Sequence, residues 1–313
     1  MNGLELSERF YNECVRPMLS EQFPELSALV AVGLFGSGSE CFGFDDGVST
    51  DHDFEPGVCI LLPDESIVDR QTAFRLERAY YKLPKTFLGY RRSAIAPVGG
   101  ARHGVLRTAD VFTEKVGAPD GILTLSQWLT VPEHALAEAT NGRLFFDGLG
   151  EVTRIRENLS RYPEDVRLKK LAGHLLLMAQ SGQYNYKRCL AHGETGAAQL
   201  AVHEFVQHAM AAAFLLNGVY QPYYKWSFRA MRRLPKLSLL AETMEYLLTT
   251  DNEGELAETK YDMIEDAAAD VIDALQSQGI TKAICGDLEK HAYSVNDAIE
   301  SGDVRNLHIL AAV

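Results

Sequence analysis

The chain has 313 residues, 46% of them hydrophobic and 23% charged, and carries a formal net charge of −13. This composition is typical of a globular protein with a sizeable core and excludes a fibrous or wholly disordered class. No apolar run reaches the roughly 18 residues that a membrane span needs, and we expect no secretory signal and no membrane partner. The negative charge argues against a general nucleic-acid binder but leaves a local basic site open.

The five cysteines are odd in number and form no C-x-x-C pair. This pattern favours free thiols over disulfides or a zinc site, and it predicts a cytoplasmic location. The length exceeds that of a usual single domain, so we expect two domains.

The first predicted elements lead to a glycine-rich turn. Apolar residues recur at helical spacing over residues 4–19 and predict an amphipathic helix. The short apolar run over residues 28–35 stops at Gly36-Ser37-Gly38-Ser39, which predicts a buried strand that feeds a tight turn. Residues 54–62 then predict a second strand.

Two aspartates, Asp51 and Asp53, stand just before the second strand. In an extended chain they point to the same face, and His52 points to the opposite one. Like charges held this close repel each other, and a cation between them relieves the repulsion. Mg²⁺ is the usual cation, bound by one or two carboxylates and the phosphates of a substrate.

These residues resemble a known superfamily. Gly36-Ser37, a spacer of about a dozen residues and Asp-x-Asp on a strand are similar to the nucleotidyltransferases with the DNA polymerase β-like fold. A closer resemblance is to the DUF4037 proteins, and it is carried by the segment GSGSECFGFDDGVSTDHDFEPG. The resemblance implies that Gly36, Ser37 and Ser39 bind a nucleoside triphosphate, with ATP expected, and that Asp51 and Asp53 bind Mg²⁺ or Mn²⁺.

Simpler interpretations of both motifs stay open. The turn is not a Walker A loop, which needs a Gly-Lys-Ser/Thr end, and it lacks the serine position of the Gly-x-Ser-x-Gly elbow. Taken alone it predicts a structural connection, and the aspartates taken alone predict a solvated turn. Their combination favours the nucleotide site.

The resemblance also implies a third carboxylate on a later strand, as a metal ligand and base. The predicted strand over residues 103–108 has no acid, and the nearest one is Asp110. Asp110 is therefore our candidate for the third catalytic residue, and Glu55, on the same face as Asp51 and Asp53, is the second. His103 is a further proton acceptor by residue type, although a lone histidine is more often structural.

The remaining pattern predicts an α+β fold, with a nucleotidyltransferase-like mixed sheet and flanking helices followed by a helical bundle. We assign residues 1–150 to a catalytic domain and residues 151–313 to a helical domain that binds the acceptor and closes over the nucleotide. Helix is expected over residues 65–81, with Phe74 and Leu76 facing inward. The other expected elements are strands over 87–98, 103–108 and 143–146, and helices over 110–116, 124–140 in two pieces, 162–181, 183–192, 195–217, 225–234, 236–250 and 255–279.

One basic segment stands out in the helical half of this acidic chain. Lys225, Arg229 and Arg232 are spaced by four and three residues, so they share one face of a helix. The simpler interpretation is a solvated basic stripe. The sharper one is that Lys225 and Arg229 neutralise the β- and γ-phosphates of the nucleotide.

These motifs together predict a metal-dependent nucleotidyltransferase. It would transfer a nucleoside monophosphate to a hydroxyl of a small molecule, a protein or an RNA end, and release pyrophosphate. The alternative is a nucleotide-binding regulatory or scaffold protein without a complete catalytic triad. A weaker rival is a toxin–antitoxin partner that acts on tRNA, against which the acidic charge argues.

Overall fold

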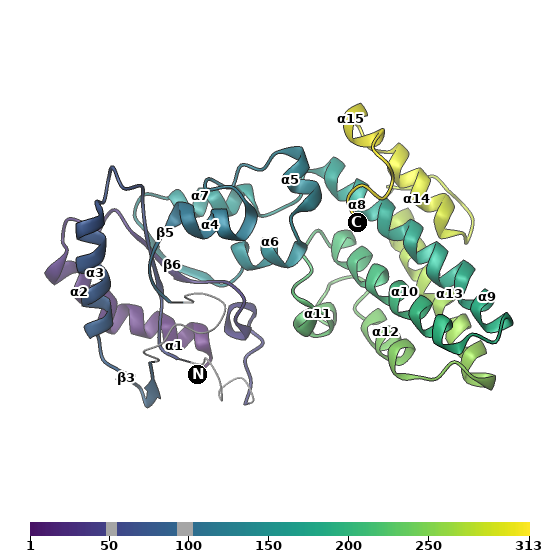
Figure 1. The fold of residues 1–313 in the computed structure, drawn as a ribbon, viewed down its shortest axis with the longest axis horizontal. Helices are drawn as coiled ribbons and strands as arrows, with labels where there is room; N and C mark the ends of the chain where they lie inside the picture. Colours follow the sequence, from purple (N-terminus) through teal and green to yellow (C-terminus); the bar gives the residue numbers. More distant parts are fainter. Residues whose placement is uncertain (48–54, 93–102) are drawn as a thin grey trace. The chain divides into compact units, whose positions relative to one another are not determined.

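The computed structural model describes residues 1–47, 55–92 and 103–313. The chain divides into two units, and each is made of more than one segment. The first unit comprises Met1–Thr124 and Val131–Ser160, and the second comprises Leu125–Thr130 and Arg161–Val313. Figure 1 shows the strands of the first unit and the long helices of the second.

A four-stranded mixed sheet organises the first unit, with strand order β5-β2-β1-β6. β1 pairs antiparallel with β2 and β6, whereas β2 pairs parallel with β5. All residues of β1 and β2 are buried, as their unbroken apolar sequences predict for strands covered on both faces. The strands are β1 (Ala31–Leu34), β2 (Cys59–Leu62), β5 (Gly104–Arg107) and β6 (Arg143–Asp147).

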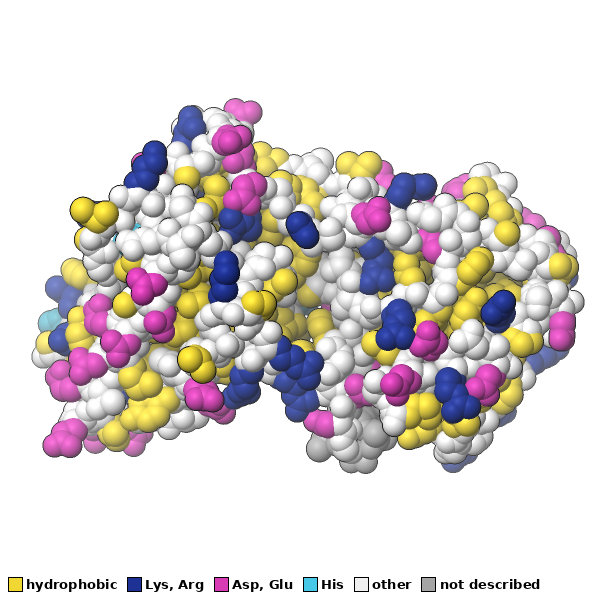
Figure 2. Space-filling model, turned by 180° about the vertical axis from the view of Figure 1, so that it is seen from behind, with side chains coloured by type: hydrophobic (Ala, Val, Ile, Leu, Met, Phe, Trp, Pro, Cys, Tyr) yellow, Lys and Arg dark blue, Asp and Glu magenta, His cyan; other side chains and the backbone are white. Residues whose placement is uncertain are grey.

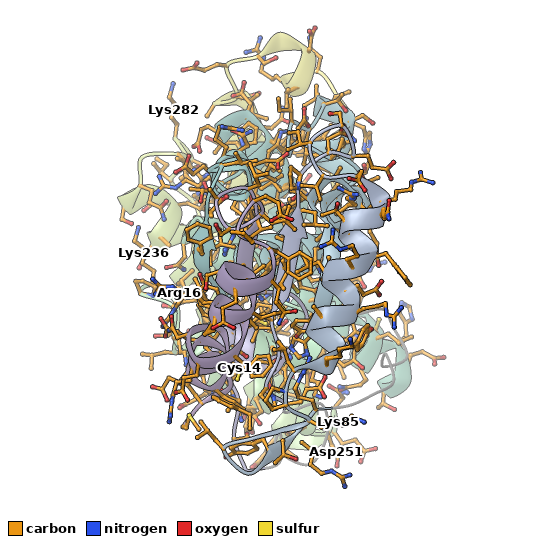
Figure 3. All side chains as sticks on the ribbon, turned by 90° about the vertical axis from the view of Figure 1, so that its left-hand side faces the viewer. Cys14, Arg16, Lys85, Lys236, Asp251 and Lys282 are labelled. Atoms are coloured by element: carbon orange, nitrogen blue, oxygen red, sulfur yellow. The ribbon has the colours of Figure 1, made fainter. Side chains whose placement is uncertain are left out.

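One face of the sheet packs against the N-terminal helices and α3. Val32 of β1 and Ile60 of β2 lie opposite each other and belong to one apolar cluster with Phe10 and Leu76. The helices supply this cluster because their apolar residues recur on one side. In Figure 3, Cys14 and Arg16 mark the N-terminal helix beside α3. The helical elements are α1 (Gly3–Phe10), the π-helical segment η1 (Tyr11–Val15), α2 (Arg16–Gln22) and α3 (Arg70–Lys82).

Further short helices follow β5 in the first unit. Phe112 of α4 is fully buried and stacks on Phe35, which follows β1, at 6.2 Å between ring centroids. α4 ends at Gly117, whose φ of 76° allows the left-handed helix cap. The helices after β5 are α4 (Thr108–Val116), α6 (Glu133–Thr140) and α7 (Glu151–Asn158), while the 3₁₀ turn η2 (Ser39–Phe42) follows β1.

The strand predicted over residues 87–98 is wrong where the structure describes it. Strands β3 (Thr86–Phe87) and β4 (Tyr90–Arg91) form a two-stranded hairpin instead. Leu88 and Gly89 between them have φ of 51° and 87°, which is the geometry of a two-residue hairpin turn. The remainder of the predicted strand, from residue 93 onward, lies outside the described residues.

The second unit is entirely helical in its described structure. Its core is lined by α10, which packs against α8, and α8 also contacts α14. The many alanines of α10 allow neighbouring helices to approach closely, as the adjacent ribbons of α8, α10 and α13 in Figure 1 show. The helices are α5 (Leu125–Thr130), α8 (Glu164–Met178), the π-helical η3 (Ala179–Tyr186), α9 (Lys187–Ala191), α10 (Thr195–Leu216), α11 (Tyr224–Met231), α12 (Leu240–Thr249), α13 (Gly254–Ser277), α14 (Leu288–Asp297) and α15 (Gly302–Arg305).

Two histidines meet inside the helical unit. Nδ1 of His174 on α8 lies 2.8 Å from Nδ1 of His208 on α10, and Nε2 of His208 lies 3.3 Å from Oε1 of Glu204. Burial, followed by the neighbouring His208 and Lys170, holds the pKa of His174 well below its usual value. Burial likewise lowers the pKa of His208, against the opposing effect of Glu204. Both rings are therefore neutral at pH 7.

The structure confirms the predicted α+β class, with a mixed sheet first and helices afterwards. Among the described residues, no helix is long and apolar enough to span a membrane. Figure 2 shows Lys and Arg side chains interspersed with Asp and Glu over one face of the molecule. All five cysteines are free thiols.

Replacing Tyr80 with Phe tests how α3 holds the sheet. The buried Tyr80 hydroxyl donates to the carbonyl of Val58 and accepts from its N–H, at 3.1 Å in both cases. The variant leaves that N–H without its partner, so we expect a loss of about 1–3 kcal/mol in the free energy of unfolding. Urea unfolding followed by circular dichroism measures it. The control, Tyr81→Phe, changes a ring that is 57% exposed and should alter stability little.

The His174–His208 pair predicts a pH dependence of the helical unit. Because both folded pKa values are lowered, the stabilisation is complete above the unfolded pKa of about 6.5 and is lost as the pH falls below it. Each histidine contributes a slope of about 1.4 kcal/mol per pH unit. We expect His174→Gln to flatten the fall between pH 7.5 and pH 5.5, whereas the exposed His192→Gln should not. Both tryptophans, Trp128 and Trp226, belong to this unit, so their fluorescence reports its unfolding.

Candidate functional site

A side-chain clamp holds the Gly36 turn. The N–H of Gly36 donates to Oδ1 of Asn141, and Nδ2 of Asn141 donates back to the Gly36 carbonyl, at 2.8 Å in each case. Asn141 ends α6, 105 residues along the chain. Both backbone groups of Gly36 are thus paired with one amide, which fixes the start of the turn.

Close backbone contact brings Asn141 to this place. The next residue, Gly142, has a φ of 63°, and a Cβ there would lie 2.0 Å from the carbonyl oxygen of Leu34. Its N–H donates to the carbonyl of Cys41 at 2.9 Å. A larger residue would push the two segments apart, so glycine at this position is a geometric requirement.

Arg156 on α7 stabilises the backbone at Asn141. Its Nη2 donates to the carbonyl oxygens of Thr140 and Asn141, and its guanidinium lies 5.8 Å from the ring centroid of Phe35. Burial lowers the pKa of Arg156. The guanidinium satisfies carbonyls that the end of α6 would otherwise leave without partners.

The rest of the turn presents backbone donors. Within the described part of the chain, no hydrogen bond is formed by the N–H groups of Ser37, Gly38 and Ser39. Ser37 is exposed and Ser39 is half-buried at the start of η2. Successive backbone N–H groups in a turn form a concave site for an anion, and the two serine hydroxyls add donors.

Strand register shows which other segments reach this turn. Gly33 lies opposite Cys59, Cys59 lies opposite Gly104, and Leu34 lies opposite Arg143. The C-terminal end of β1 therefore lies beside the N-terminal ends of β2, β5 and β6. The Gly36 turn leaves this end of the sheet, and the segments that contain Glu55 and His103 enter it.

Glu55 and His103 form a pair at this end of the sheet. Nδ1 of His103 lies 3.2 Å from Oε1 of Glu55, and the histidine side chain is 9% exposed. The ring lies against Gly57, where a Cβ would come within 2.5 Å of Cγ. Nε2 of His103 is buried and has no hydrogen-bond partner among residues 1–47, 55–92 and 103–313. Of the candidate third carboxylates, Glu55 is thus the one at this end.

A lysine lies directly beside the turn. Nζ of Lys115, in the last turn of α4, would be 3.7 Å from a Cβ built at Gly36. The same Nζ is 3.2 Å from Oε2 of Glu138 on α6, and these two side chains are 22% and 16% exposed. The ion pair joins α4 to α6 next to the clamped glycine.

The predicted metal ligands Asp51 and Asp53 lie outside the described residues. Elsewhere, within the described ranges, no group of three His, Cys, Asp or Glu side chains is arranged to hold a metal ion. Asp110 lies exposed in the first turn of α4. It is five residues before Lys115, which is a rise of about 7.5 Å along the helix, so the last turn of α4 reaches Gly36 and the first does not.

The predicted basic residues lie on α11, in the second unit. Nζ of Lys225 and the guanidinium of Arg229 lie 5.0 Å and 5.6 Å from the Trp226 ring centroid. Arg232 caps the helix and forms an ion pair with Glu245. Lys225 and Arg229 are therefore brought together, as their spacing predicts, while their contact with a nucleotide stays a prediction.

Residues 128–227 match the family model of DUF4037, a domain of unknown function. This part of the chain is similar to the DUF4037 domains. The match confirms the DUF4037 assignment, although it lies after the Gly-Ser and Asp-x-Asp motifs that suggested it. The matched region contains Asn141, which holds Gly36, Arg156, which supports Asn141, and Glu138, which pairs with Lys115, as well as Lys225.

Other comparisons add little to the DUF4037 match. A crystal structure of a nucleotidyltransferase-like protein from Exiguobacterium sibiricum 255-15, at 1.90 Å resolution, is similar over 92% of this chain and 81% of that chain, with 14% identity and a TM-score of 0.38. A TM-score this low does not establish a common fold. No curated protein matches the chain.

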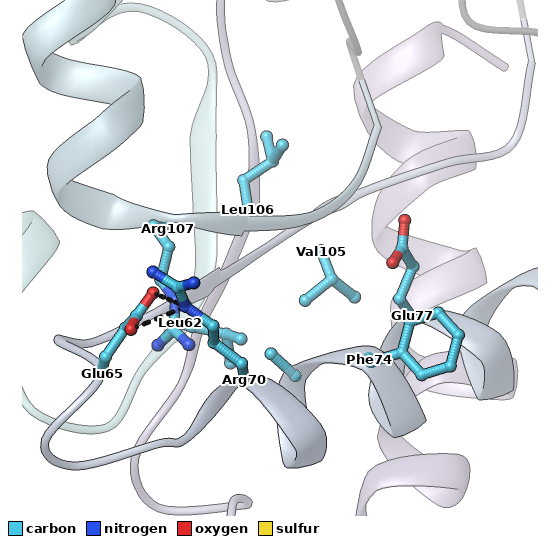
Figure 4. Close-up of a pocket in the computed structure, with 9 residues that line it drawn as sticks. Leu62, Glu65, Arg70, Phe74, Glu77, Val105, Leu106 and Arg107 are labelled. Carbon is cyan, nitrogen blue, oxygen red and sulfur yellow. Dashed lines mark hydrogen bonds and ion pairs between the residues drawn. The ribbon is translucent and has the colours of Figure 1, made fainter.

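A separate cavity of about 300 Å³ lies at the opposite end of the sheet (Figure 4). It is bordered by Leu62 and Arg107, the last residues of β2 and β5, and by Phe74 on α3. Arg107 donates to the carbonyl of Pro63 at 2.6 Å, and Arg70 pairs with Glu65 at 2.8 Å. Three of its four charged side chains, those of Glu65, Arg70 and Arg107, are thus already engaged within the protein, and we assign the cavity no role.

Replacing Asn141 with Ala tests the clamp. The variant removes both hydrogen bonds to Gly36. The part-buried N–H and C=O of Gly36 then lose their protein partner. We expect the free energy of unfolding to fall by about 1–3 kcal/mol, measured by urea unfolding. Hydrogen exchange should also show faster exchange in peptides that span the Gly36 turn. The exposed Asn158→Ala, a matched change at the end of α7, should leave both measurements near wild type.

Proposed function

We propose that the chain is a metal-dependent nucleotidyltransferase, with ATP as the expected donor. It would transfer a nucleoside monophosphate to a hydroxyl of a small molecule, a protein or an RNA end. One observation carries this proposal: the Gly36 turn is clamped by Asn141 and contains three successive N–H groups that form no hydrogen bond within the described residues. These donors lie at the end of the sheet where β2 begins. β2 itself starts shortly after Asp51 and Asp53 in the sequence.

The turn would bind the triphosphate. The N–H groups of Ser37, Gly38 and Ser39 and the hydroxyls of Ser37 and Ser39 are donors for phosphate oxygens. The clamp positions these donors before the ligand arrives, so little conformational entropy is lost on binding. The serine hydroxyls alone would lack this fixed geometry.

Asp51 and Asp53 would hold Mg²⁺ or Mn²⁺. When bound, the metal ion would neutralise phosphate charge and lower the pKa of the acceptor hydroxyl. The hydroxyl oxygen forms a bond to the α-phosphorus while the bond from that phosphorus to the bridging α–β oxygen breaks. Pyrophosphate leaves with that oxygen. We assign the removal of the hydroxyl proton to Glu55, because Asp110, the first candidate in the sequence, follows β5 at the opposite end of the sheet.

Lys225 and Arg229 are proposed as further phosphate contacts. Their two cationic groups flank Trp226 on one helix, which limits the freedom of both side chains. The segment from residue 205 to residue 241 contains no Asp or Glu, so this stretch of sequence is positively charged in an otherwise acidic chain. The five free cysteines support a cytoplasmic location for this activity.

The rival function is nucleotide binding without transfer, in a regulatory or scaffold protein. The arrangement of α4 favours it, because the exposed Asp110 occupies the first turn while the last turn lies beside Gly36. Glu55, the other candidate, is engaged with His103. A protein of this kind would bind the nucleotide and release it unchanged.

Replacing Asp51 and Asp53 with Asn separates the two functions. Labelled-nucleotide transfer and pyrophosphate release would be measured with wild type and the double variant, with Mg²⁺ or Mn²⁺ and a panel of hydroxyl acceptors. We expect metal-dependent turnover by wild type and a loss of at least about 100-fold in the variant, because the charge on the phosphates is no longer neutralised.

The matched control is Asp45→Asn with Asp46→Asn, which removes two charges from a nearby turn and should retain activity. Tight nucleotide binding by wild type without turnover on any acceptor would favour the regulatory protein. Absence of both binding and turnover would contradict the nucleotide site itself.

A further inference from the structure

A cation lies beside the Gly36 turn within the first unit. Nζ of Lys115 would be 3.7 Å from a Cβ at Gly36, so the ammonium group lies within van der Waals contact of that position. Lys115 comes from α4, whose sequence gives no sign of this contact. The spatial relation is fixed by packing within one unit and does not depend on the placement of the other.

The turn itself does not use this ammonium group. Both backbone groups of Gly36 are paired with Asn141, at 2.8 Å each. Within the described part of the chain, the ammonium group of Lys115 has a single hydrogen bond, to Oε2 of Glu138 at 3.2 Å. An ammonium group has three N–H donors, so two remain for another acceptor.

Glu138 sets the position of this ammonium. The carboxylate reaches from α6, the helix that ends at the clamp residue Asn141. The pair therefore places a positive charge beside Gly36, the residue that directly precedes the N–H groups of Ser37, Gly38 and Ser39. Backbone donors with an adjacent lysine suit an anion with several charged oxygens, because the ammonium adds attraction that the amide dipoles alone do not supply.

We propose that Lys115 binds the terminal phosphates of the nucleotide at the Gly36 turn, with Glu138 as its partner in the free protein. This inference rests on the proposed function and adds a residue to its binding site. Lys115 keeps one contact to Glu138 and directs its other donors to the phosphate oxygens. Lys225 and Arg229, on α11, are not needed for this contact.

The test compares ligands with and without phosphates. Isothermal titration calorimetry with Mg²⁺ present would measure ATP, inorganic tripolyphosphate and adenosine against wild type, Lys115→Met and Lys115→Arg. We expect Lys115→Met to bind ATP and tripolyphosphate at least about tenfold more weakly, with adenosine unchanged, since a charge-assisted hydrogen bond is lost. Lys115→Arg should lose less, because it keeps the charge.

Two further variants separate binding from structure. Lys82→Met removes the same charge from the exposed last turn of α3 and should change affinity less than about twofold. Glu138→Gln breaks the ion pair but leaves the ammonium, so affinity for tripolyphosphate should stay or rise. A fall as large as that of Lys115→Met would show that the pair only supports the fold, and would overturn the proposal.

The outcomes also distinguish this inference from the transferase. Equal affinity of Lys115→Met and wild type for both phosphate ligands would overturn the role of Lys115 and leave the proposed function standing. Tripolyphosphate binding that depends on Lys115, in a protein without transfer activity, would support the inference and contradict the transferase. If wild type bound neither phosphate ligand, both would fall.

Discussion

The paired hydrogen bonds between Asn141 and Gly36 are the contact on which the arrangement of the site depends. They connect the end of β1 to the end of α6, and the next residues of each segment enter η2 and β6. Because one amide binds both the N–H and the C=O of a single glycine, it orients the two peptide units on either side of that residue. The donors of Ser37, Gly38 and Ser39 follow directly after this fixed residue.

Electrostatics at the same place are balanced by contacts between three helices. Arg156 of α7 neutralises the carbonyl end of α6, and Lys115 of α4 is paired with Glu138 of α6. Each cation thus has a partner on α6, and the helix acts as a common support for charges that come from sequence positions far apart. Half-buried ion pairs of this kind depend on good geometry, which the packed helices supply.

Much of the fold follows from local pattern. The apolar run before Gly36 became β1, the paired helical pieces around Pro132 became α5 and α6, and the Lys225 stripe lies on α11. Phe74 was expected to face inward but is 58% exposed, because it stands two residues from Leu76 and so about 200° around the helix from that buried side chain. Pattern therefore predicts an element better than the orientation of each member.

The site was predictable only in part. Gly36, Ser37 and Ser39 are recognisable because their signal is contiguous, whereas Asn141, Lys115 and Glu138 join the turn across long separations, 105 residues for Asn141. No periodicity links residues so far apart, and each is an ordinary helical residue by type. Gly142, just after a helix and before a strand, was the nearest available signal, since a glycine there indicates close backbone approach. Asp51 and Asp53 lie outside the described residues, and their roles stay predictions.

The position of α5 in the sequence determines when the parts of each unit become available during synthesis. It belongs to the second unit although it is flanked on both sides by residues of the first, so the chain passes between the units three times. During synthesis, α5 leaves the ribosome before β6 has completed the sheet and before Tyr162, the ring partner of Trp128, and the neighbouring α8 exist. The rest of the unit to which α5 belongs, Arg161–Val313, is made only afterwards. Neither unit corresponds to a fragment that a single cut of the gene would yield.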